Sequence, residues 1–116
     1  MAKARWHILR SEDALTVSRV LPVRFDISAE AVFPLVHPLR LATQIRQDMW
    51  RLLQNLRGFA PAVEVVSEGG SLRVRAGGAV MGAVPGTAQM ALEGLLNAAP
   101  NRARWCAYAR LRRSGP

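Results

Sequence analysis

The segment PLRLATQIRQDMWRLLQNLRG, from Pro38 to Gly58, is the longest part of the chain with a single hydrophobic period. Its apolar side chains recur at steps of three and four residues, which places them on one stripe of an α-helix. The stripe consists of Leu41, Ala42, Ile45, Met49, Leu52, Leu53 and Leu56. Proline suits the first turn of a helix, and glycine suits the position just past its end. The pattern therefore predicts a helix over 38–58 that lies on a hydrophobic core.

A second line of side chains runs beside this stripe. Arg46, Trp50 and Arg57 follow it at helical spacing, so the predicted helix presents an indole between two guanidinium groups. An exposed indole can stack on a nucleobase while arginines bind phosphates. In the alternative interpretation Trp50 closes the edge of the core and the arginines reach past it to solvent. Amphipathic helices often carry an aromatic residue at that boundary, which favours the alternative.

The charge of the chain is strongly unbalanced. Among 116 residues there are 15 arginines, one lysine and eight acidic residues, which gives a net charge of +8. Such a surface attracts polyanions, so nucleic acid or an acidic protein is the expected partner. A GC-rich coding sequence would also enrich arginine, and the shortage of acids is therefore the more informative feature.

The composition also bounds the type of protein. Half of the residues are hydrophobic, which is enough for the core of a single domain over 1–116, with 114–116 expected to be loose. A single cysteine, Cys106, excludes a disulfide within the chain and suits a reducing compartment. No apolar run reaches the roughly 20 residues that a membrane span requires. The expectation is a cytoplasmic protein without a membrane partner.

A β-hairpin is predicted after the helix. Residues 63–67 and 72–76 alternate in polarity, and Gly69 and Gly70 supply the positive φ angles that a two-residue turn requires. With Glu68 opposite the first residue after the turn, the apolar side chains of both strands share one face.

The same register sets the charges on the other face of the hairpin. Glu64 lies opposite Arg75, and Val66 lies opposite Arg73. A cross-strand pair between Glu64 and Arg75 would leave Arg73 as the cation without a partner.

The remaining elements follow from weaker patterns. They are a possible short strand around Ile8, a strand over 15–25, a short helix over 29–36, a third short strand over 79–84, a helix that begins after Thr87, and a last helix over 102–112. Together they predict an α+β fold. A small antiparallel sheet, made of the hairpin over 63–76 and one or two short strands, is covered on one face by the long central helix and one or two C-terminal helices. The order helix–three strands–helix resembles that of a double-stranded-RNA-binding domain, but the lysine cluster with which that family binds phosphates is missing.

No catalytic, cofactor-binding or metal-binding arrangement is found in the sequence. The glycine-rich stretch RAGGAVMGAVPG, over 75–86, has neither the GK[ST] ending nor the GxGxxG spacing of phosphate-binding loops. Its glycines are therefore interpreted as turn and bulge positions. His7 and His37 lie far apart and have no acidic neighbours at ligand spacing. The chain is therefore expected to be a binding protein and not an enzyme.

Two functions stay open from the sequence. One is a nucleic-acid-binding domain, for RNA or DNA, and the other is a subunit or adaptor that binds an acidic protein, with Trp50, Trp105 and Tyr108 as contact residues. The candidate binding residues are Arg46, Trp50, Arg57, Arg73, Arg102 and Trp105.

Overall fold

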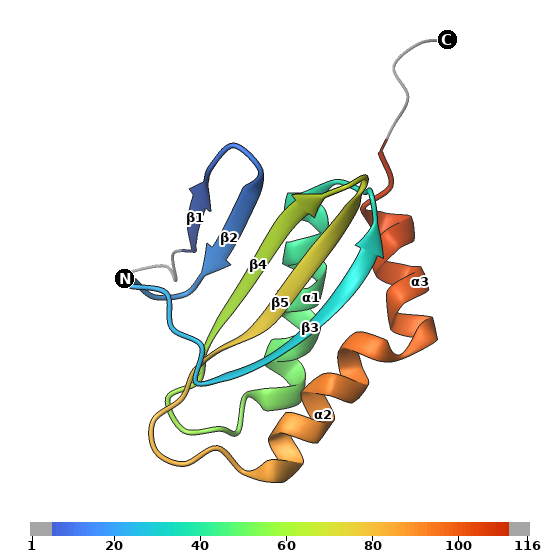
Figure 1. Ribbon diagram of the computed structural model, residues 1–116. Coiled ribbons are helices and arrows are strands. Elements are labelled where there is room, and N and C mark those ends of the chain that lie inside the picture. The colour runs from blue at the N-terminus through green and yellow to red at the C-terminus, as the bar shows by residue number, and fades with distance from the viewer. Residues whose placement is uncertain (1–5, 112–116) are drawn as a thin grey trace, which may run out of the picture.

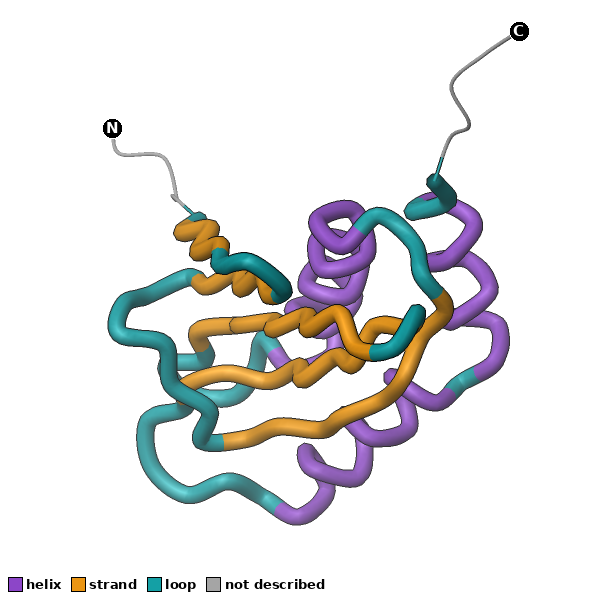
Figure 2. Tube along the Cα trace, turned by 45° about the horizontal axis from the view of Figure 1, so that its top comes forward, coloured by secondary structure: helices purple, strands orange, loops and turns teal. Residues whose placement is uncertain are grey.

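The computed structural model describes residues 6–111, in which a five-stranded antiparallel sheet packs against three helices. The elements in chain order are β1 (His7–Arg10), β2 (Ala14–Ser18), β3 (Ile27–Pro34), α1 (Pro38–Leu53), β4 (Ala60–Glu68), β5 (Ser71–Ala79), α2 (Gly86–Asn97) and α3 (Ala99–Tyr108). The strand order is β1-β2-β4-β5-β3, and the helices lie on one face of the sheet (Figures 1 and 2). The predicted α+β fold is confirmed. The predicted loose residues 114–116 lie outside the described part.

The hairpin of β4 and β5 has the predicted register. Val65 lies opposite Val74, and Glu64 lies opposite Arg75. Gly69 and Gly70 have φ angles of +56° and +84°, as the turn requires.

Helix α1 begins at the predicted residue but ends earlier than predicted. The N–H of Arg40 donates a hydrogen bond of 3.4 Å to Nδ1 of His37, which caps the first turn. Leu41, Ile45 and Met49 are fully buried, as expected for the stripe, whereas Leu52, also assigned to the stripe, is 42% exposed. The helix stops at Leu53 because the chain turns there to bring Phe59 into the core ahead of β4.

The segment predicted as a helix over 29–36 is not helical, and its residues 29–34 belong to β3. Ile27, Ala29 and Phe33 are buried and Ala31 is partly buried, which is the alternation of a strand. The strand pairs with β5 over eight positions. Asp26, a residue type that often caps a helix, instead accepts a hydrogen bond of 2.9 Å from the N–H of Val80. Long-range pairing overrides the local capping signal here.

Two other predicted strands are shorter than expected or absent. The strand over 15–25 corresponds to β2, which leaves the sheet after Ser18. No strand forms over 80–84, because β5 itself continues through Gly77 and Gly78 to Ala79. The sequence instead predicted a turn or bulge at these two glycines. A Cβ atom at Gly77 would collide with the carbonyl of Ile27, so the close approach of the strands requires glycine there.

The sheet therefore differs from that of the double-stranded-RNA-binding domain. Only two strands, β4 and β5, lie between α1 and α2 in the chain, and the sheet is completed by strands that precede α1. The predicted similarity in element order is wrong. Among the described residues, no helix is both long and apolar enough to span a membrane.

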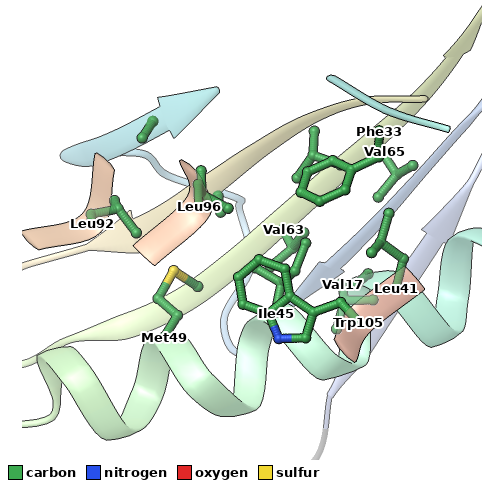
Figure 3. Close-up of a cluster of buried hydrophobic side chains, with 14 of the residues drawn as sticks. Val17, Phe33, Leu41, Ile45, Met49, Val63, Val65, Leu92, Leu96 and Trp105 are labelled. Atoms are coloured by element: carbon green, nitrogen blue, oxygen red, sulfur yellow. The ribbon is translucent and has the colours of Figure 1, made fainter. Parts of the chain in front are cut away.

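The core lies between the sheet and the helices, and Trp105 of α3 is one of its largest members (Figure 3). Helix α3 begins at Ala99, three residues before the predicted start, with Pro100 in its first turn. The Trp105 side chain is 0% exposed, and its ring lies 6.2 Å from that of Phe33. Its Nε1 donates a hydrogen bond of 2.8 Å to Asp48 of α1. The prediction that Trp105 contacts a partner is therefore wrong.

Candidate functional site

A surface groove of about 590 Å³ opens beside the middle of α1. We call it the aromatic groove. It is lined by Trp6, Arg19, Val20, Arg46, Trp50, Gly58, Phe59 and Ala60. These residues come from α1, from the segment before β1, from the loop after β2 and from the entry to β4, so only the folded chain assembles them.

Trp50 forms the exposed aromatic surface of this groove. Its side chain is 43% exposed, although it follows the buried Met49 in α1. Its ring stacks on Phe59, with 6.2 Å between centroids and 6° between planes. Phe59 is buried and fixes the indole from the protein side. Trp50 therefore fits both interpretations made from the sequence, because it borders the core and part of its ring is exposed to solvent.

Arg46 lies one helical turn before Trp50 and also lines the groove. Its guanidinium carbon lies 4.2 Å from the ring centroid of Trp6, a cation–π distance. Burial lowers the pKa of Arg46, but an arginine still keeps its charge at neutral pH. Trp6 is a lining residue that sequence reasoning missed, because nothing in its local pattern connects it to α1.

Arg57 was predicted to lie on the central helix, but α1 ends at Leu53, before Arg57. It is exposed in the turn that follows α1, and the next residue, Gly58, lines the groove. Gly58 has a φ of +66°, the left-handed conformation predicted for it. The structure thus brings Arg46 and Trp50 together in the groove, whereas Arg57 is not a lining residue and only precedes the lining residue Gly58 in the chain.

Arg73 is not the unpartnered cation that the hairpin register predicted. It donates hydrogen bonds of 2.9 Å to Glu68 and 3.4 Å to Glu30, and these bonds raise its pKa. Arg75, which was expected to pair with Glu64, lies with its guanidinium carbon 4.3 Å from the ring centroid of Phe25. Arginine side chains are long enough to reach past their direct cross-strand neighbour. On β5, Arg73 alternates with the buried Leu72 and Val74, so it lies on the face of the sheet away from the core and from α1, which carries Trp50.

Arg102 has a structural role instead of the predicted binding role. Its guanidinium carbon lies 4.1 Å from the ring centroid of Phe33, and it donates hydrogen bonds to the carbonyls of Val32 and Leu96. Tyr108 is 57% exposed on α3 and does not line the aromatic groove. The six candidate residues therefore divide between the groove and distant structural positions.

The groove combines aromatic rings with positive charge. None of its described lining residues is acidic, while Arg19 and Arg46 both contribute to its wall. Elsewhere in residues 6–111, no group of three or more histidine, cysteine or acidic side chains could hold a metal ion. Burial raises the pKa of the Cys106 thiol, more than the nearby Arg102 lowers it, so this cysteine is not activated. The arrangement suits recognition of an aromatic anion.

Comparisons of the chain with known protein families, with curated proteins and with solved structures found no match. The chemistry of the groove is therefore the basis for a functional proposal.

Proposed function

We propose that this chain is a small basic binding domain that binds single-stranded nucleic acid, RNA or DNA, at the aromatic groove. The observation that carries the proposal is the exposed indole of Trp50, beside Arg46, in a groove whose described lining contains no acid. Unpaired bases stack on aromatic side chains, and arginines bind the phosphates between them. The net charge of +8 supplies long-range attraction for the polyanion.

A single strand suits this groove better than a duplex. The groove offers the flat face of Trp50, and only an unpaired base can turn its own face onto that ring. Base pairs in a duplex are already stacked on their neighbours. The groove also presents one small aromatic surface and not an element shaped to enter a DNA groove.

We expect Trp50→Ala to weaken binding of a labelled oligothymidylate of roughly 10 nucleotides by about 10-fold, because one base loses its stacking partner. Duplex binding should change much less. Fluorescence anisotropy at low ionic strength measures both affinities. Tyr108→Ala is the matched control, since it removes an aromatic side chain that is exposed outside the groove. Equal affinities of the native chain and the Trp50→Ala variant would contradict the proposal.

The same titrations, repeated over a range of salt concentrations, test whether the arginines contact phosphates. Each lost phosphate contact lowers the salt dependence of single-strand binding by about 0.7 in log–log slope, so the Arg46→Ala/Arg57→Ala variant should lose up to about 1.4. The Arg10→Ala/Arg40→Ala variant carries the same net charge and changes two exposed arginines outside the groove lining. If both double variants reduce the salt-dependence slope by the same amount, the positive charge attracts the strand without a defined binding site.

A second candidate function is that of a subunit or adaptor that binds an acidic protein. The observation that favours it is apolar exposure beside the groove, where Val20 and Leu21 are 38% and 50% exposed. Such exposed apolar side chains are common where another protein docks. A single cysteine suits either function in the reducing cytoplasm. Absence of any measurable oligonucleotide binding at low salt would favour this second function.

A further inference from the structure

Two stacked pairs stand next to each other in the aromatic groove. One is Trp50 on Phe59, and the other is the Arg46 guanidinium on Trp6. Arg46 and Trp50 are four residues apart on α1, which makes them neighbours on the helix surface. Trp6 and Trp50 therefore belong to one continuous site, although 44 positions separate them in the sequence.

The lining of the groove is unsuited to a phosphate alone. Apart from the two arginines it consists of apolar side chains and glycine, and such surface gains little from a hydrated anion. A nucleobase, in contrast, gains free energy when its face is buried against aromatic side chains of this kind. The groove volume of about 590 Å³ lies within the range of roughly 300 to 1,000 Å³ found for small-ligand sites.

Arg46 can position the ligand while it stays stacked. The Arg46 guanidinium carbon lies over the Trp6 ring, and a guanidinium carries five N–H donors in its own plane, so contact through its face leaves those donors for a ligand. Those donors suit a phosphate oxygen or an acceptor atom on the edge of a base. The geometry thus places an aromatic surface and an anion-binding group within one small site.

We infer that the aromatic groove binds a nucleobase turned out of its strand, with Trp6 as a second aromatic contact and Arg46 as the group that positions the adjoining phosphate. This inference rests on the proposed nucleic-acid function and deepens it, since it makes the base and not the backbone the main determinant of affinity. The ligand chemistry is a base joined to a phosphate, which either a strand or a free mononucleotide can supply.

The test compares two labelled oligonucleotides of equal length, an oligothymidylate and its fully abasic analogue, which have the same backbone charge. The native chain should bind the abasic strand at least about 10-fold more weakly, because no base can stack. The two Trp6 variants should also differ in affinity. Trp6→Ala should bind the oligothymidylate more weakly than the native chain, whereas Trp6→Phe should keep most of the native affinity. A thymidine mononucleotide should compete for the groove only at much higher concentration if the site belongs to a strand.

Intrinsic fluorescence gives a second readout that does not depend on affinity alone. Trp105 is fully buried, so quenching by a stacked base must come from Trp6 and Trp50. The oligothymidylate should quench the native chain, the abasic strand should not, and Trp6→Phe should lose part of the quenching.

The outcomes separate the two proposals. Equal binding of both strands, without quenching, would overturn base insertion and the stacking of a base on Trp50, and would leave only single-strand binding through the phosphates. Displacement of the oligothymidylate by polyglutamate of equal charge, as effectively as by unlabelled oligothymidylate, would overturn base insertion in favour of an acidic protein partner. Binding of neither strand would overturn base insertion together with the proposed function.

Discussion

Replacement of Trp105 by alanine is expected to lower the free energy of unfolding by about 4 kcal/mol, the usual cost of removing a large buried aromatic side chain. The indole is 0% exposed and packs against the sheet side chain Phe33, with 49° between the rings. Truncation leaves a cavity between α3 and the sheet that the surrounding core cannot fill. It also removes the donor to Asp48, so the loss combines packing with a hydrogen bond.

Urea unfolding followed by circular dichroism measures this loss. Tyr108→Ala is the matched control, because Tyr108 lies on the same helix and is 57% exposed. It should change stability by less than about 1 kcal/mol. A Trp105→Ala variant as stable as the Tyr108→Ala variant would contradict the structural role of Trp105.

The misinterpretation of Trp105 shows what local sequence cannot supply. Helix α3 carries arginines on several sides, and its apolar edge is too narrow to show which side chain faces the core. The decisive contact is with Asp48, which lies 57 positions earlier in the chain. In the sequence, Trp105 is an aromatic residue close to positive charge. These two properties occur both in interfaces and in cores, so they do not decide between the two.

The predictable elements are those whose evidence is local. The β4–β5 hairpin has its register set by Gly69 and Gly70, and the start of α1 is set by Pro38 and an uninterrupted stripe. Strand β3 lacks such a signal, since Asp26 offers a helix cap and only pairing with β5 makes the segment extended. Intrinsic strand preference depends strongly on such neighbours.

The candidate site divides in the same way. The helical period alone places Arg46 beside Trp50, and the structure assembles both in one groove. Trp6 and Phe59 come from segments without periodic relation to α1, so their place in the groove depends on the whole fold. Arg73 was misjudged because its side chain reaches Glu68, its diagonal neighbour across the hairpin, and also Glu30 of the unexpected strand β3.

Asp48→Ala is expected to lower the free energy of unfolding by about 2 to 3 kcal/mol at neutral pH, mostly because the Trp105 N–H is left buried without an acceptor. The Asp48 side chain is 12% exposed and also accepts a hydrogen bond of 2.7 Å from Arg104. Arg104 is itself about half exposed, so that ion pair adds less than about 1 kcal/mol. Asp48→Asn keeps a neutral oxygen for the indole and should cost less than Asp48→Ala.

The pH dependence of stability should show that the ionised form of Asp48 stabilises the fold. Burial by itself would raise the pKa of this carboxyl, but the hydrogen bonds from Trp105 and Arg104, with the charges of Arg104 and Arg51, outweigh burial and lower the pKa below its usual range. The ionised form therefore stabilises the fold fully above the unfolded-state pKa of about 3.9, and this contribution disappears as the pH falls through the lower pKa of the folded state.

Below about pH 4, the native chain should consequently lose more stability than Asp48→Asn, which has no carboxylate to protonate at this position. Urea unfolding along an acid series measures the difference, with Glu12→Gln as the control because Glu12 is an exposed carboxylate. The Glu12→Gln variant should follow the acid response of the native chain. If the stability of Asp48→Asn also falls with acid as much as that of the native chain, the hydrogen bonds from Trp105 and Arg104 do not depend on the charge of Asp48. The contact between α1 and α3 is then stabilised by packing and neutral hydrogen bonds.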